Sequence, residues 1–133
     1  MTAQPTTELG IHVQLKQPYE TAIERTRAAL KAEGFGVITE IDVKKTMKEK
    51  LGVDGRPYVI LGACNPKLAH AALGEEADLG LLLPCNVVVY EIDAGTRVAA
   101  VNAGAMLGMV GNPALAPIAD DIQARLRRVL ESL

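Results

Sequence analysis

Two apolar runs separated by three turn-forming residues constrain the fold of this 133-residue chain more than any other feature. The run Asn86–Ile92 reads NVVVYEI, the run Thr96–Asn102 reads TRVAAVN, and Asp93–Gly95 between them reads DAG. Strand-like runs joined by so short a segment ending in glycine predict a β-hairpin. Part of the sheet is therefore expected to be antiparallel.

Changes of hydrophobic period predict further strands and helices along the chain. Alternating or continuously apolar runs favour strands, whereas apolar side chains three or four residues apart favour helices. The additional strands predicted in this way are Leu9–Leu15, Phe35–Val43 and Tyr58–Cys64. The predicted helices are Pro18–Glu33, a short exposed helix over Val43–Leu51, Pro66–Leu73, and a final helix from Pro113, capped by Asn112, to Leu133.

The resulting order is β-α-β-(α)-β-α-β-β-α. Two pairs of strands are joined without a long helix between them, which favours an α+β fold with a single layer of helices on a mixed or mainly antiparallel sheet. We expect one domain over residues 1–133, with the polar residues 1–8 frayed.

Composition and charge disfavour several classes of function. Lysine plus arginine number 14 against 16 acidic residues, so a formal charge of −2 supplies no field to attract nucleic acid or an anionic membrane. One Phe, three Tyr and no Trp leave few platforms for base stacking. No apolar run approaches the ~20 residues that span a bilayer. Without a recognisable signal peptide at Met1–Gly10, we expect a cytoplasmic protein with reduced thiols.

The only two cysteines are each followed by asparagine, at Cys64-Asn65 and Cys85-Asn86. Asn65 stands between a predicted strand and a predicted helix that begins with Pro66, which is the position of a helix N-cap. Cys64 at a helix N-terminus is either an inert core residue or a thiol that ionises readily. Asn65 therefore has a structural explanation, while Cys64 is a candidate site residue.

Asn86 has no comparable explanation, because Pro84 and Cys85 precede a strand rather than a helix. An unpaired amide beside three valines costs about 1–3 kcal/mol when it is buried. Asn86 is therefore expected either to face solvent at the edge of its strand or to bond a loop or a ligand.

The direction of two strands decides whether the thiols can meet. If Tyr58–Cys64 and Asn86–Ile92 run parallel, Cys64 and Cys85 lie at opposite ends of the sheet, about 20 Å apart at ~3.3 Å per residue. A disulfide needs Cα atoms within ~7 Å, so an intramolecular bond is not expected in that topology. The connection Gly74–Pro84 could instead return the chain first, or a dimer could bring the two cysteines together.

Other polar clusters give weaker signals. His70 lies six residues after Cys64 and is a further candidate, but the spacing of the cysteines and histidines lacks the paired motifs of zinc sites, and we predict no metal site. The acidic loop with Glu75, Glu76 and Asp78 and the lysines of Val43–Leu51 are interpreted as solvated. The segment between Met106 and Met109 either fills the core or lines an apolar pocket or a dimer contact.

The segments GACNPKLAHAAL and LLLPCNVVVYE resemble the family known as domain of unknown function 302. The resemblance extends from about Leu9 to Leu130 and implies an α+β domain, often a homodimer, with no established activity. Where relatives often carry Asp-Pro before the final helix, this chain has Asn102, Ala103 and Gly104. The family pattern falls on Cys64, Asn65, Pro66, Leu73, Pro84, Cys85 and Asn86.

Two functions compete at this stage. The favoured one is a non-enzymatic binding or interaction module that dimerises and holds a small molecule near the two Cys-Asn segments, with Cys64, Asn65, Cys85, Asn86 and His70 as candidates. The alternative is a thiol-based redox, sulfur-transfer or metal-handling protein that uses Cys64 or Cys85. No catalytic constellation is recognisable, and no cofactor is identified.

Overall fold

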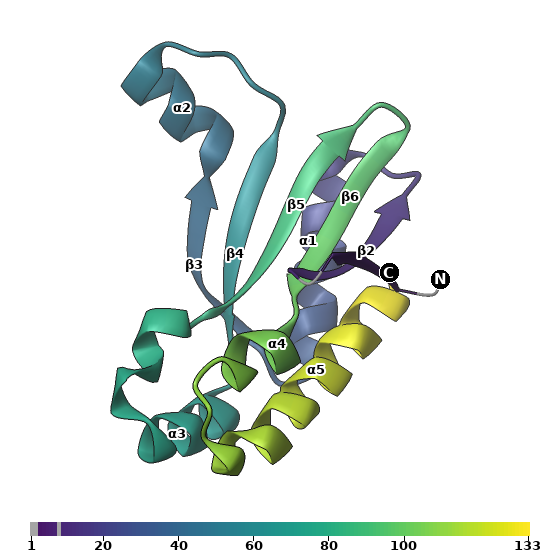
Figure 1. Cartoon of the computed structure of the whole chain (residues 1–133). Helices are drawn as coiled ribbons and strands as arrows, with labels where there is room; N and C mark the ends of the chain where they lie inside the picture. Colours follow the sequence, from purple (N-terminus) through teal and green to yellow (C-terminus); the bar gives the residue numbers. More distant parts are fainter. Residues whose placement is uncertain (1–2, 8) are drawn as a thin grey trace.

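The computed structural model describes residues 3–7 and 9–133, and residues 4–7 only by their backbone. Six strands, five α-helices and two short 3₁₀ helices follow one another along these residues (Figure 1). They are β1 (Gln4–Thr7), β2 (Gly10–Leu15), α1 (Tyr19–Ala32), β3 (Gly36–Asp42), α2 (Val43–Leu51), β4 (Tyr58–Cys64), α3 (Pro66–Glu75), η1 (Ala77–Leu82), β5 (Cys85–Ile92), β6 (Gly95–Val101), α4 (Ala103–Gly108), η2 (Pro113–Leu115) and α5 (Ala116–Glu131).

The strands form one sheet in the order β1-β2-β6-β5-β4-β3, and all neighbours are antiparallel. The α+β fold, its element order and the β5–β6 hairpin are therefore confirmed. In the hairpin, Val89 pairs with Val98 and Ile92 with Gly95. Gln4–Thr7, part of the segment expected to be frayed, forms β1; residues 1, 2 and 8 of that segment lie outside the described residues.

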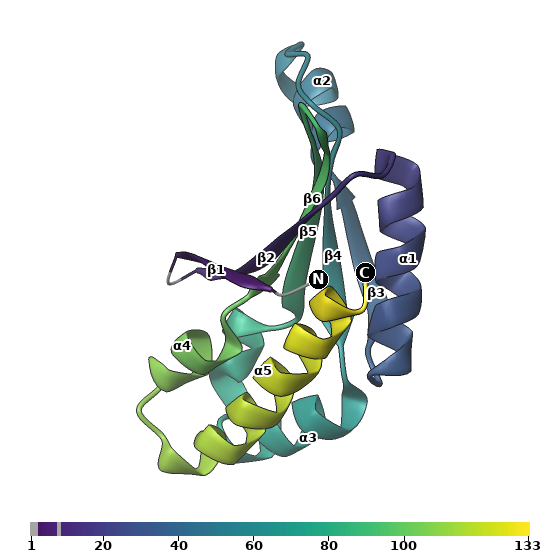
Figure 2. The same ribbon diagram turned by 90° about the vertical axis from the view of Figure 1, so that its right-hand side faces the viewer.

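One face of the sheet carries the core. Alternate residues of β2, β4, β5 and β6, such as Val13, Leu61, Val87 and Val98, are buried beneath α1 and α5. α1 and α5 pack against each other and against β6. Figure 2 views the sheet nearly on edge, with α1 along one face and no helix over the opposite face of its upper part. The predicted single layer of helices follows from this one-sided burial.

Of the two arrangements considered for Tyr58–Cys64 and Asn86–Ile92, the parallel one is wrong, and the return of the chain through Gly74–Pro84 is confirmed. β4 and β5 are antiparallel neighbours, with Ala63 paired to Cys85 and Tyr58 to Tyr90. The reason is that α3 is followed by the 3₁₀ helix η1, and the two elements bring the chain back to the end of the sheet that it has just left (Figure 1).

The remaining helices differ in how they are held. α2 projects beyond the sheet with no buried residue, as the lysine-rich pattern predicts, and Asp42 caps it by accepting from the Lys45 N–H at 2.9 Å. Asn112 caps η2 rather than α5 itself, and Asn102 caps the short α4, which the sequence pattern did not identify. No helix in the described part of the chain combines the length and apolar character needed to cross a bilayer.

Candidate functional site

Both cysteines lie at the same end of the sheet. Because Ala63 pairs with Cys85, Cys64 is one residue past the partner of Cys85, which corresponds to a Cα separation of about 6 Å rather than 20 Å. The pleat of the sheet nevertheless directs neighbouring side chains to opposite faces. Both cysteines are free thiols, with Cys64 half-buried and Cys85 buried. The predicted large separation is thus overturned, and no bond joins the sulfurs.

An apolar cavity of about 280 Å³ lies just beyond these strand ends. It reaches both cysteines because it extends past the last residues of β4 and the first of β5, beneath α3 and η1. Only Cys64, Asn65 and Cys85 contribute polar or sulfur-bearing side chains to its wall. The complete lining is Phe35, Ile38, Ala63, Cys64, Asn65, Ala69, Ala72, Leu73, Gly80, Leu83, Pro84, Cys85, Leu107 and Ile122.

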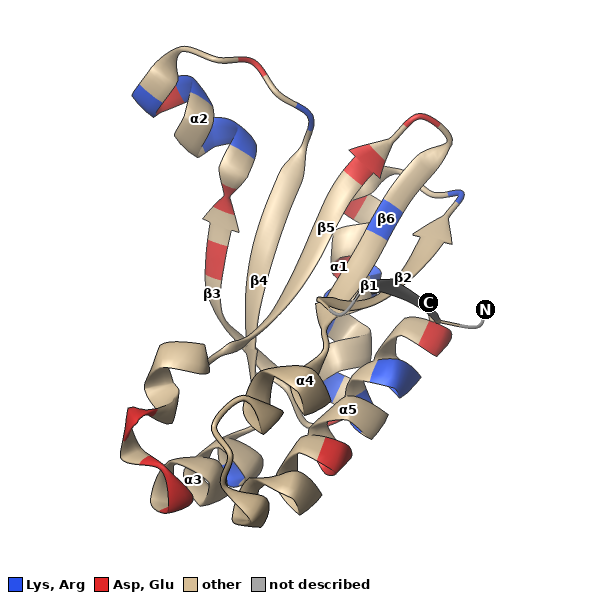
Figure 3. Ribbon diagram, viewed as in Figure 1, with Lys and Arg blue, Asp and Glu red and all other residues tan. Residues whose placement is uncertain are grey.

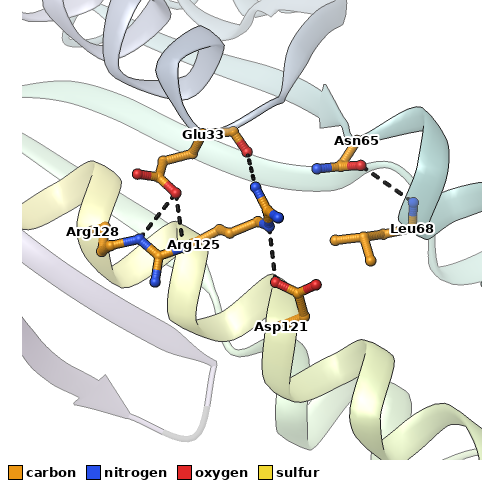
Figure 4. A network of polar contacts seen from close by, with 6 residues as sticks. All are labelled: Glu33, Asn65, Leu68, Asp121, Arg125 and Arg128. Carbon is orange, nitrogen blue, oxygen red and sulfur yellow. Dashed lines mark hydrogen bonds and ion pairs between the residues drawn. The ribbon is translucent and has the colours of Figure 1, made fainter.

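Asn65 is held at the cavity wall by its role as N-cap of α3. Its Oδ1 accepts from the Leu68 N–H at 3.2 Å, and Pro66 occupies the first turn (Figure 4). The strand-to-helix transition predicted from the sequence is confirmed in this detail. The amide nitrogen of Asn65 lies beside Gly34, where a Cβ on that glycine would approach it to 3.0 Å.

A polar network behind the cavity fixes α1 against α5 (Figure 4). Arg125 Nη1 donates to the Glu33 carbonyl at 2.9 Å, and Arg125 Nε donates to Asp121 Oδ1 at 2.8 Å. Arg128 forms an ion pair with Glu33 at 2.9 Å. The network positions α5, whose Ile122 closes part of the cavity. Sequence analysis missed it, although Asp121 and Arg125 have the i, i+4 spacing of a helical ion pair.

The second asparagine does not belong to the cavity. Asn86 is exposed and lies on the helix-free face of the sheet, together with Tyr58, Val88 and Tyr90. The rings of Tyr58 and Tyr90 stack there with centroids 5.0 Å apart. Asn86 is exposed, as one of the alternatives left open for it expects, and it lines a hollow of about 290 Å³ on that face. The two Cys-Asn segments therefore contribute three residues to one site, not four.

His70 and the methionine segment are also placed by the fold. His70 is exposed on α3 and is not part of the cavity wall, although Ala69 and Ala72 beside it are. Within α4, Leu107 is buried against the cavity and Met106 packs against the core, whereas Met109, just after the helix, is 73% exposed. Among residues 3–7 and 9–133, no three His, Cys, Asp or Glu side chains gather as a metal site would need.

Burial also sets the protonation of the inner thiol. Removal from water, with a smaller contribution from the neighbouring Cys64, raises the pKa of Cys85 from 9.0 to about 11. A group with this pKa remains a neutral thiol at pH 7. Cys85 therefore behaves as an apolar wall residue of the cavity rather than as a thiolate nucleophile.

Replacing each of the two asparagines by alanine should change the free energy of unfolding by different amounts. Asn65→Ala removes the N-cap of α3 and should lower the free energy of unfolding by about 1 kcal/mol. Asn86→Ala alters an exposed side chain and should change it by less than about 0.5 kcal/mol. Urea unfolding at pH 7 measures both values. Equal losses in the two variants would contradict the assignment of the cap to Asn65 alone.

Comparisons with known proteins place this chain within a family. A crystal structure of the uncharacterized conserved protein DUF302 from Bacillus stearothermophilus is similar, with a TM-score of 0.86 and 36% sequence identity. The match covers 94% of this chain and 98% of that chain. No curated protein matches the sequence. The family model for domain of unknown function DUF302 matches residues 11–133, and the chain therefore belongs to the DUF302 family.

Proposed function

We propose that this protein is a binding module that holds a small, uncharged and largely apolar molecule in the cavity beside Cys64 and Cys85. The observation that carries the proposal is the cavity itself, which is apolar on nearly all sides and contacts no charged side chain. Pockets for small molecules combine apolar walls with a few polar groups that orient the ligand. The thiols of Cys64 and Cys85 line the cavity and are the groups we assign to that purpose.

The volume limits the size of the ligand. An apolar cavity of ~150 Å³ binds benzene, so the cavity of about 280 Å³ suits a molecule of about two fused rings or a short branched chain. A charged ligand would lose its hydration without gaining an ionic partner, since no lining side chain carries a charge. Indole and 1-naphthol are therefore suitable probes.

Two alanines of α3 provide a matched test. Ala69 lines the cavity, whereas Ala71 is exposed on the same helix. Ala69→Leu should fill part of the cavity and weaken indole binding at least about tenfold, or ~1.4 kcal/mol, whereas Ala71→Leu should leave it unchanged. Isothermal titration calorimetry measures the affinity. Failure of the wild-type protein to bind either probe, or equal binding by both variants, would contradict the proposal.

A second candidate function is thiol chemistry at the same cavity. Its support is that both sulfurs border a single space and are close enough for Cys64 to affect the ionisation of Cys85. Against it stands the raised pKa of Cys85, which leaves Cys64 as the only candidate nucleophile at neutral pH.

The two free thiols also support our proposal that the protein works in the cytoplasm, where thiols remain reduced.

We further infer that the protein functions as a homodimer. Large apolar side chains are unusually exposed at several places, including Leu51 at 70% and Leu81 at 88%. The face of the sheet opposite α1 carries half-buried Tyr58, Val88 and Tyr90. Apolar surface of this kind favours association with another protein surface.

A further inference from the structure

Exposed apolar side chains concentrate on one projecting part of the molecule. We call residues 38–53, which run from β3 through α2, the arm. Five of the nine large hydrophobic residues that are exposed in the described chain belong to it. They are Ile38 at 62%, Ile41 at 48%, Met47 at 41%, Leu51 at 70% and Val53 at 51%. No residue of α2 is buried, so the described part of the chain leaves this helix uncovered.

The helix of the arm is basic, although the β3 part of the arm carries Glu40 and Asp42. Its helix α2 carries Lys44, Lys45, Lys48 and Lys50 against the single acid Glu49. Figure 3 shows this basic helix beyond one end of β3. Lys48 forms an ion pair with Asp54 at 3.2 Å. A helix that presents both apolar and cationic side chains fits a surface that is apolar and anionic.

Such a surface exists on the same chain, at the opposite end of β3. We call residues 73–81, at the junction of α3 and η1, the acidic segment. It carries Glu75, Glu76 and Asp78, and its Leu73 and Leu81 are 39% and 88% exposed. Figure 3 shows the acidic segment and α2 on the same side of the molecule, at opposite ends of β3. β3 is the last strand of the described sheet on this side.

The side of the molecule that carries β3 therefore has a basic, apolar patch at one end and an acidic, apolar patch at the other, so two copies of this side can match each other. When two copies meet along β3 with their strands antiparallel, a two-fold axis brings each arm beside the acidic segment of the other copy. A two-fold interface of this kind uses the same patch on both subunits and closes after two copies. We propose that a second copy of this chain docks here, with the arm of each subunit on the acidic segment of the other. The inference rests on the homodimer of the proposed function.

The charges and the apolar residues act together in this arrangement. Opposite potentials orient the two copies, while the exposed leucines, isoleucines, valine and methionine leave water. A different acidic partner could match the arm alone, but it would leave the acidic segment and its Leu81 uncovered. The second copy covers both patches with one contact repeated twice, which is why we choose it.

Charge reversal tests the arrangement because the two patches can be changed separately. Lys44→Glu with Lys45→Glu reverses the arm and leaves the Lys48–Asp54 pair in place. Glu75→Lys with Asp78→Lys reverses the acidic segment and leaves Glu76, which accepts from Asn112, intact. Lys16→Glu with Lys31→Glu makes the same change of net charge as the arm variant, at exposed lysines outside both patches.

Light scattering coupled to size exclusion measures the mass of each protein against the 14.1 kDa of one chain. We expect wild type and the Lys16/Lys31 variant to be dimers, and each patch variant alone to dissociate at least about tenfold more readily. Mixing the arm variant with the acidic-segment variant should restore a dimer, because both contacts again join opposite charges. Circular dichroism measures whether each variant is folded. A dimer restored on mixing also requires both variants to be folded.

Three results would overturn the inference in distinguishable ways. A monomeric wild type would overturn the homodimer and this interface with it. A wild-type dimer that persists in both patch variants would place the interface elsewhere and leave the homodimer standing. Dissociation of both patch variants without recovery on mixing would show that the two patches do not face each other. Ile38, Leu73 and Gly80 belong both to the cavity wall and to this interface, whereas the Ala69→Leu test of indole binding changes a residue outside both patches.

Discussion

Replacing Gly95 by alanine is expected to lower the free energy of unfolding by about 3 kcal/mol or more. Gly95 begins β6 with φ of 146°, a conformation that residues with a side chain rarely adopt. A Cβ at this position would overlap the carbonyl oxygen of Leu15 and lie 3.1 Å from its carbonyl carbon. Neither atom can move aside freely, since Leu15 pairs with Thr96 in the sheet.

Gly55→Ala is the matched control for this prediction. Gly55 lies in the connection between α2 and β4, and an added Cβ there meets nothing within 4 Å. The control should change stability by less than about 1 kcal/mol, and its reduced freedom in the unfolded chain could make it stabilising. Urea unfolding of wild type and both variants gives the comparison. A loss below about 1 kcal/mol for Gly95→Ala would show that the hairpin tolerates a side chain at its first β6 residue.

The elements of this fold could be predicted from the sequence because their signals are local. The stripe Ile118, Ile122 and Leu126 recurs at helical spacing, and all three side chains are at least half-buried in α5. The DAG turn specified the β5–β6 hairpin in the same way. The helix α4 was missed because its two glycines and Met106 form no clear apolar stripe over so few residues.

The direction of β5 could not be predicted, because it depends on a connection without periodicity. A strand, a helix and a second strand favour a parallel crossover when nothing else intervenes. Here η1 adds a turn after α3, and its sequence ADLGLL has neither a helical stripe nor an alternation. The direction of β5 decides at which end of the sheet Cys85 lies. A parallel β5 would place it far from Cys64, whereas the antiparallel β5 places the two cysteines at the same end.

The cavity depends on residues that only the folded chain brings together. Phe35 precedes β3, Leu107 belongs to α4 and Ile122 to α5, so its walls come from distant parts of the sequence. The sequence argument identified Cys64, Asn65 and Cys85, because a cap and a strand start are local features. It gave Asn86 equal weight through the repeated dipeptide, yet strand alternation places Asn86 on the opposite face from Cys85.

Alkaline pH should destabilise the protein through Cys85. The pKa of this thiol is raised to about 11 in the folded chain, so the folded state keeps its proton after the unfolded state has lost it. The stabilisation is therefore fully present below pH 9 and is lost as the pH rises from 9 to 11. Two pKa units correspond to a loss of at most about 2–3 kcal/mol over this range.

Cys85→Ala isolates this contribution, because the pKa values of Tyr19 and Tyr58 are also raised, mainly by burial, and both tyrosines remain in the variant. The difference in unfolding free energy between wild type and Cys85→Ala, measured by urea unfolding at several pH values, should shrink as the pH passes from 9 to 11. Thiolate absorbance of a Cys64→Ser variant reports the ionisation of Cys85 directly, and burial should keep its midpoint well above 9 there too. A midpoint below 9 would mean that the cavity stabilises a thiolate. The thiol-based function would then be favoured over the binding of an apolar ligand, because a charged sulfur in the wall is incompatible with an uncharged, apolar site.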